Sequence, residues 1–66
     1  MVNLLFLKTF VDAAKTGSVR QSAENNFVTQ PAVSQHIRQL ENKFGCLFFE
    51  RRQRKLALTE AGKIFL

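Results

Sequence analysis

The sequence predicts a small, mainly α-helical domain of the winged helix-turn-helix class, with a three-helix core, a β-hairpin wing and the start of a linker helix. Three observations predict this class: two helices joined by a tight turn, a polar face on the second of them, and an arginine-rich hairpin that follows. The 66 residues suffice for one small core and leave little room for the walls of a large cleft. We expect the winged helix-turn-helix domain over residues 1–58 and a truncated linker or dimerisation helix over residues 59–66.

The composition argues against several classes of protein. The chain is 45% hydrophobic and contains seven Phe, which argues against a disordered tail. One Cys cannot form an internal disulfide, and one Cys with one His cannot complete a zinc finger. No apolar run approaches the roughly 20 residues of a membrane span, and the N-terminus lacks the basic start of a secretory signal. We therefore expect a cytoplasmic protein that needs no metal or cofactor and has no membrane partner.

The charge of the chain favours a polyanionic partner. Ten Lys or Arg against five Asp or Glu give a formal net charge of +5. Four of these basic residues fall within residues 51–55. Nucleic acid is the first candidate partner, and an anionic membrane surface is the second.

The first helix is expected over about residues 3–15, ending before Gly17, which accepts a positive φ without penalty. Helical spacing predicts one buried stripe that consists of Leu4, Leu7, Phe10, Val11 and Ala14. The residues off this stripe are Leu5, Lys8, Thr9 and Asp12.

A second, short helix is expected from a cap at Ser18 to about Asn25. Ser18 and Gln21 have the capping-box spacing, in which each side chain satisfies a free backbone N–H near the other residue. Asn25 and Asn26 then favour a break, because Asn tolerates left-handed backbone conformations.

The third helix is expected over about residues 30–43, with Thr29 as its N-cap, Pro31 in its first turn and Gly45 at its end. The predicted buried stripe consists of Val33, Ile37, Leu40 and Phe44. The opposite side carries Pro31, Gln35, Arg38 and Asn42, with Gln30, Ser34 and Glu41 nearer its flank. Toward the N-terminus this face is small, uncharged and rich in hydrogen-bonding groups.

A β-hairpin is expected from two short runs, residues 46–50 and 55–58, with the basic loop between them. Adjacent Phe48 and Phe49 would point to opposite faces of a strand, one of them into the core and the other under the hairpin or the last helix. The simplest place for Phe10, Phe27 and Phe44 is also the core. Thr59 can cap the last helix.

Two features suit nucleic acid. Side chains such as Gln30, Ser34 and Gln35 can hydrogen-bond base edges in a major groove, and the helix N-terminus at Thr29 and Gln30 favours a phosphate. On the hairpin, the basic side chains that can bind phosphate or enter a minor groove are Arg51, Arg52, Arg54 and Lys55. The plainer interpretations are a solvated helix face and a solvated charge run or membrane-surface patch.

Catalysis finds little support. Ser34 and His36 point about 200° apart on a helix, which argues against a nucleophile–base pair. We expect His36 to be a partly exposed structural or DNA-flanking residue. Cys46 follows a helix end, where a thiolate is disfavoured, and we expect it to be a small packed residue.

Four segments resemble the N-terminal domain of LysR-type transcriptional regulators: residues 18–24, 28–41, 48–51 and 58–62. The stretch Thr-Gln-Pro-Ala-Val-Ser at residues 29–34, with Leu-Glu after it, is highly specific. The resemblance implies a winged helix-turn-helix, a linker helix that forms a homodimer, and a C-terminal inducer-binding domain that is absent here. Ser22 stands where the family usually has Ala.

The resemblance also implies which residues bind double-stranded DNA at an inverted-repeat operator. The base- and phosphate-contacting positions fall on Thr29, Gln30, Pro31, Ser34, Gln35 and Arg38. The minor-groove arginine falls on Arg54, with Arg51 and Arg52 on the backbone, although Gln53 between them leaves open which one enters the groove. Gln35 stands where many members carry Arg, so we expect a different base preference there.

Sequence-specific DNA binding is therefore the leading hypothesis. A protein-interaction or membrane-surface module is the second, and an enzyme is the third. A dimer surface is expected to include Leu5 and residues 64–66, although with a shortened linker helix we expect a monomer or a weak dimer.

Overall fold

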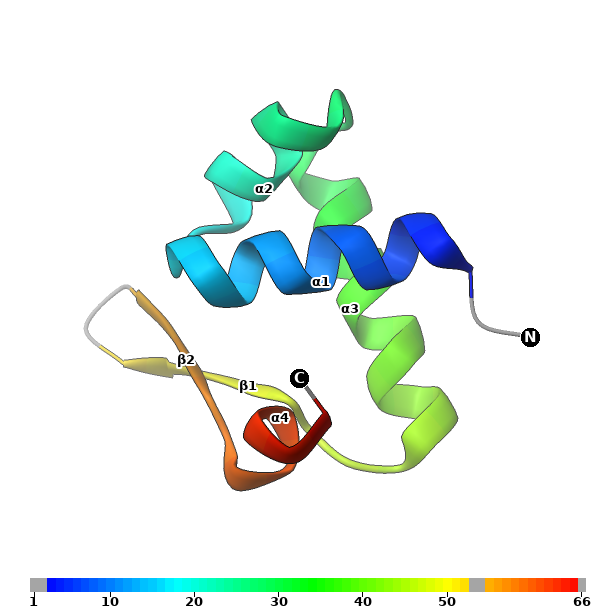
Figure 1. Cartoon of the computed structure of the whole chain (residues 1–66), viewed down its shortest axis with the longest axis vertical. Coiled ribbons are helices and arrows are strands. Elements are labelled where there is room, and N and C mark those ends of the chain that lie inside the picture. Colours follow the sequence, from blue (N-terminus) through cyan, green and yellow to red (C-terminus); the bar gives the residue numbers. More distant parts are fainter. Residues whose placement is uncertain (1–2, 53–54, 66) are drawn as a thin grey trace.

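The computed structural model describes the backbone of residues 3–52 and 55–65, and the side chains of the same residues except 51, 52 and 55. The elements are α1 (Leu4–Thr16), α2 (Val19–Asn26), α3 (Gln30–Phe44), β1 (Phe49–Arg52), β2 (Lys55–Leu58) and α4 (Glu60–Phe65). In Figure 1, α1 crosses in front of α3 with α2 above it, and the hairpin and α4 lie on the other side of α1. This arrangement is the predicted winged helix-turn-helix class.

Side-chain caps set the starts of the three main helices. The side-chain oxygens of Asn3, Ser18 and Thr29 accept hydrogen bonds from the N–H groups of Leu5 (2.8 Å), Gln21 (3.0 Å) and Ala32 (3.2 Å), respectively. Each bond satisfies an N–H that has no partner within its helix. The predicted caps at Ser18 and Thr29 are confirmed, while Asn3 precedes α1 instead of belonging to it.

The capping box at the start of α2 is only half formed. The Gln21 side chain donates to Asn25 Oδ1 (3.0 Å) along its own helix, and the Ser18 N–H donates to Thr16 Oγ1 (3.2 Å). The end of α1 therefore supplies the acceptor that the capping-box pattern assigns to Gln21.

Two apolar clusters form the core where α1, α2, α3 and the base of the hairpin meet. One contains Ala13, Ala23, Val33 and Ile37, and the other contains Phe10, Leu40 and Phe48. The ring of Phe10 lies 5.5 Å from that of Phe48, 5.2 Å from that of Phe49 and 5.3 Å from that of Phe65. Three aromatic contacts on one fully buried ring join the first helix to the hairpin and to α4.

The predicted buried stripe of α1 is partly wrong. Thr9 and Ala13 are fully buried, whereas Leu4 is 80% exposed. The reason is that α1 packs against both α2 and α3, so its covered face is wider than a single stripe and is shifted toward Thr9. The Thr9 hydroxyl tolerates burial because it is hydrogen-bonded.

Two residues predicted to lie in the core are exposed to different extents. Phe27 is 96% exposed, because it is the left-handed C-cap of α2 (φ 56°) and its side chain leaves the helix there. Phe44, in the last turn of α3, is 46% exposed, although its ring contacts the rings of Phe48 and Phe65. Cys46 is exposed instead of packed, since it lies beyond the end of α3.

The hairpin is antiparallel, with Phe49 opposite Leu58 and Arg52 opposite Lys55. Its first strand begins at Phe49 and not at Cys46, since the N–H of Phe48 bonds to a side chain of α3. Phe48 enters the core as one of the predicted pair, and half-buried Phe49 packs against both apolar clusters. Thr59 caps α4 as predicted, accepting from the N–H of Gly62 (3.1 Å).

Candidate nucleic-acid interface

The outer face of α3 carries the predicted polar side chains on one continuous surface. A shallow depression follows the helix there and is lined by Pro31, Ser34, Gln35, Arg38, Gln39 and Asn42. Gln30, Pro31, Gln35 and Arg38 are exposed, and Ser34 is half-buried. The structure therefore brings these predicted site residues together on the face turned away from the core.

The N-terminal end of α3 is built to attract an anion. Thr29 precedes the helix in an extended conformation, and its hydroxyl oxygen accepts from Ala32, which leaves the hydroxyl hydrogen free to donate. The positive end of the helix dipole lies at the same place. Thr29 and Gln30 are both exposed there, as phosphate binding requires.

Arg38 joins this polar face to the hairpin. Beside the depression on α3, it also lines a groove between α3 and the hairpin, together with Ser34, Glu41, Glu50 and Leu56. The structure therefore places one cation at the junction of the polar α3 face and the hairpin.

The hairpin arginines are only partly placed. The register sets Arg51 opposite Leu56 and Arg52 opposite Lys55. Arg54, the predicted minor-groove residue, lies outside the described residues, as do the side chains of Arg51, Arg52 and Lys55.

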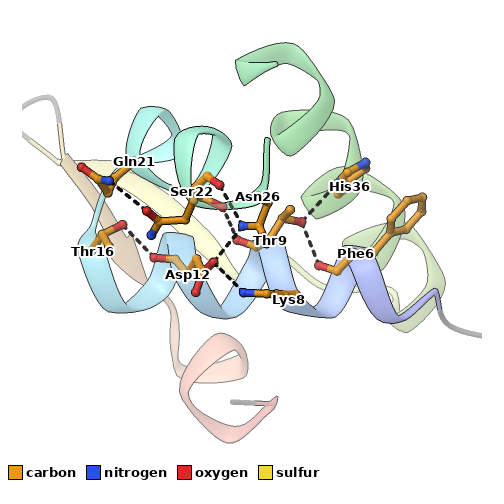
Figure 2. A network of polar contacts seen from close by, with 10 residues as sticks. Phe6, Lys8, Thr9, Asp12, Thr16, Gln21, Ser22, Asn26 and His36 are labelled. Carbon is orange, nitrogen blue, oxygen red and sulfur yellow. Dashed lines mark hydrogen bonds and ion pairs between the residues drawn. The ribbon is translucent and has the colours of Figure 1, made fainter. Parts of the chain in front are cut away.

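His36 is buried against α1 and not partly exposed as predicted. Its Nδ1 lies 3.0 Å from Thr9 Oγ1, and its ring stacks on the ring of Phe6 at 4.3 Å (Figure 2). When Thr9 Oγ1 donates to the carbonyl of Phe6 (3.0 Å), the tautomer of His36 that carries its hydrogen on Nδ1 completes the shared bond. Burial lowers the pKa of His36 below its usual value of 6.5. His36 thus holds the inner side of α3 against α1.

A polar network sets the position of α2 on α1 (Figure 2). Ser22 Oγ donates to the carbonyl of Thr9 (2.7 Å), and Asn26 Nδ2 donates to Asp12 Oδ2 (2.7 Å) and to the carbonyl of Ser22 (2.8 Å). Sequence reasoning missed these contacts. The one signal was Ser22, a hydroxyl where the family usually has Ala, and it is fully buried here.

The arrangement gives no support to catalysis by Ser34 and His36. Ser34 lines the outer depression of α3, whereas His36 faces α1. Within residues 3–52 and 55–65, no three His, Cys, Asp or Glu side chains gather in a way that can hold a metal ion. In the same ranges, no helix has both the length and the apolarity to cross a membrane.

The fold and the site together define a winged helix-turn-helix domain whose second helix presents a polar outer face. The chain belongs to the LysR family of bacterial regulatory helix-turn-helix proteins, whose sequence model matches residues 4–63.

Known proteins of this family resemble the chain closely. It is 46% identical over 61 residues to the HTH-type transcriptional regulator CitR of Bacillus subtilis (strain 168), covering 92% of this chain and 21% of that protein. A LysR-family regulator from Eggerthella lenta DSM 2243 superposes with a TM-score of 0.85 at 41% identity, over 97% of this chain and 90% of that one. DarR of Vibrio fischeri, solved in complex with DNA, superposes with a TM-score of 0.90 at 38% identity, over 98% of this chain and 22% of that one. The chain thus spans about a fifth of the length of the curated relatives it matches.

Proposed function

We propose that this chain is the DNA-binding domain of a bacterial LysR-type transcriptional regulator and binds double-stranded DNA in a sequence-specific manner. Residues 30–43 enter the major groove, and residues 51–55 of the wing lie on the minor groove and the phosphate backbone. The observation that carries the proposal is the continuous polar face of α3 with Arg38 at its edge toward the hairpin. The proposed DNA-contacting residues are Thr29, Gln30, Pro31, Ser34, Gln35, Arg38, Arg51, Arg52 and Arg54.

Base edges and phosphates call for different side chains. An exposed Gln such as Gln35 can donate to and accept from the same adenine edge, and Ser34 is small enough to let the helix approach. Phosphates carry no base identity and are bound by charge, which suits Arg38 and the wing arginines. The likeness to DarR, solved in complex with DNA, supports the same mode of binding.

The remaining parts of the proposal concern the whole protein. We infer a cytoplasmic regulator in which residues 59–66 begin a linker helix that mediates dimerisation. Two copies of the domain would then meet an inverted-repeat operator, and a C-terminal domain would bind the inducer. The 66-residue chain should sediment as a monomer or a weak dimer at micromolar concentration.

Selection of bound sites from a randomised DNA library tests the central claim. Wild-type chain should enrich one short motif, and Gln35→Ala should relax preference at one base pair, costing about 1–3 kcal/mol if that contact is bidentate. Gln21→Ala is a matched control, because Gln21 is exposed on α2 and bonds to Asn25. An unchanged motif for Gln35→Ala would overturn the assignment of the reading face. Binding to anionic vesicles without any DNA preference would instead indicate a membrane-surface module.

A further inference from the structure

One carboxylate connects the recognition helix to the base of the wing. Glu41 lies near the end of α3, half-buried, and its Oε2 accepts from the backbone N–H groups of Phe48 (2.8 Å) and Phe49 (3.3 Å). These two N–H groups lie where the chain leaves the loop after α3 and enters β1. An ionised acceptor makes such bonds roughly twice as strong as neutral ones.

The same short segment is held from its other side by the start of α4. Thr59 donates its backbone N–H to the carbonyl of Phe48 (3.0 Å) and its hydroxyl to the carbonyl of Leu47 (2.6 Å). Gly62 packs so closely under the Phe48 carbonyl that a Cβ at this position would collide with its oxygen. Residues 47–49 are therefore fixed between two helices, with Glu41 supplying the contact from α3.

The direction of the wing depends on this base. An isolated two-stranded hairpin is marginally stable in water, so its orientation has to come from contacts with the rest of the domain. Beyond the base, the one backbone hydrogen bond between β2 and the end of α1 among the described residues is a long bond from Leu56 N to the carbonyl of Gly17, the C-cap of α1 (3.5 Å). The side chains of Phe49, Leu56 and Leu58 also pack against the two apolar clusters and keep the hairpin on the domain. Removing the carboxylate would leave the N–H groups at the start of β1 without their acceptor and would change the angle of the hairpin on this packing.

We propose that Glu41 is a positioning residue for DNA binding: it fixes the angle between the recognition helix and the wing, so that both reach one DNA duplex together. The inference rests on the proposed function. When α3 and the wing belong to one rigid body, binding of one to DNA raises the effective concentration of the other at its own DNA site. A more flexible link between them reduces this gain in affinity. Loss of Glu41 should therefore weaken the wing contact while α3 keeps its base preference.

The test compares Glu41→Ala, Glu41→Gln and Glu41→Asp in the 66-residue chain. The Gln oxygen can accept the same two bonds, whereas Asp keeps the charge but is one methylene too short to reach both N–H groups. Glu24→Ala is the control, because Glu24 is an exposed carboxylate that pairs with Arg20 on α2. Each variant is titrated with the DNA motif selected by the wild type, at several salt concentrations and with hydroxyl-radical footprinting.

We expect Glu41→Ala and Glu41→Asp to bind about tenfold more weakly, to lose the minor-groove footprint of the wing and to have a salt slope lower by about one to two. Their selected motif should remain that of the wild type. Glu41→Gln should stay within about threefold of wild type, and Glu24→Ala should be unchanged. A wild-type footprint and salt slope for folded Glu41→Ala would overturn the proposal, as would equal loss of base preference and wing contact.

A measurement without DNA separates this inference from the proposed function. Residual dipolar couplings of backbone amides report the orientation of the hairpin relative to α3 in each variant. Glu41→Asp should change the hairpin couplings and leave those within α3 as they are, and Glu41→Gln should restore them. If the wild type selects no DNA motif, the proposed function fails. If the couplings of Glu41→Asp equal those of the wild type, the positioning role fails even where DNA is bound.

Discussion

At the scale of the residue, the inner and outer sides of α3 use polar groups for opposite purposes. On the outer side, exposed groups such as Gln35 keep their hydrogen-bonding capacity for a partner. On the inner side, Nδ1 of His36 shares a hydrogen bond with Thr9, and the ring of Phe6 stacks on the imidazole. A buried polar group is tolerated only with such a partner, which is why Thr9 has to be buried with it.

This burial predicts a pH dependence of stability. The folded chain has a lowered pKa at His36, so the unfolded chain takes up the proton first as the pH falls below about 6.5. The free energy of unfolding should therefore be constant near pH 7–8 and decrease as the pH falls from 6.5 toward the lower folded pKa. Urea unfolding between pH 8 and pH 5 measures this.

His36→Asn is the matched control, because its amide can still donate to Thr9 but does not titrate. Since the chain has one His, the variant should show little pH dependence above pH 5. Equal slopes for wild type and His36→Asn in this range would refute the assignment to His36.

Phe27 gives a second prediction at this scale. A non-glycine residue in the left-handed conformation destabilises the folded chain by roughly 1–2 kcal/mol. The Phe27 side chain is 96% exposed, so its packing offsets little of this strain. Phe27→Gly should raise the free energy of unfolding by about 1 kcal/mol, after the extra backbone entropy of Gly in the unfolded chain is subtracted. Thermal unfolding checks this, and a lower Tm would mean that the aromatic ring makes a stabilising contact.

At the scale of the element, the sequence predicts those features that depend on contacts between residues close together in the chain. The caps at Ser18, Thr29 and Thr59 are confirmed, because each bonds within three residues of itself. The predicted start of the first strand is wrong, because the N–H of Phe48 donates to Glu41, which lies seven residues away in α3. No periodicity in residues 46–50 carries information about that carboxylate.

The contact between α4 and the wing base predicts a strong effect from one added methyl group. In Gly62→Ala the new Cβ would press on the Phe48 carbonyl and on the Leu58 side chain, so α4 would have to move away from the hairpin. We expect a loss of about 1–3 kcal/mol in the free energy of unfolding, measured with urea. Lys63→Ala, exposed on the same helix, is the control and should change it by less than about 0.5 kcal/mol. A Gly62→Ala chain as stable as wild type would show that this approach is not close.

At the scale of the whole molecule, acidic groups are mostly paired away from the polar face of α3. Asp12, Glu24 and Glu60 each pair with a Lys or Arg of their own helix, on α1, α2 and α4. Glu41 is bonded to backbone N–H groups of the wing base. Such surface pairs add little stability, yet they neutralise charge locally on α1, α2 and α4.

The polar face of α3 was predictable for the same reason as the caps: a helix period fixes which residues share a side, so Gln30, Ser34 and Gln35 follow from spacing alone. The contacts on the inner side of α3 could not be predicted from spacing, because they depend on where α1 crosses α3. His36 and Thr9 are 27 residues apart and meet only in the folded chain. Spacing likewise places Arg51 and Arg52 on the hairpin without saying how far either reaches.

The residues proposed to read base edges lie on α3, and most of the arginines proposed to bind phosphate lie on the wing. Base preference and salt dependence should therefore separate in experiment. Arg54→Ala should weaken binding to every DNA sequence alike and lower the magnitude of the salt slope by about one, because one cation that displaces a counterion from DNA is lost. Gln35→Ala should leave the salt slope unchanged and alter only the preferred base, because an uncharged side chain displaces no counterion. Titrations of the selected motif and of a scrambled duplex between about 50 and 200 mM salt measure both quantities. If Arg54→Ala changed the motif while Gln35→Ala changed the salt slope, α3 and the wing would have each other's proposed roles, and the orientation of the domain on DNA would have to be reversed.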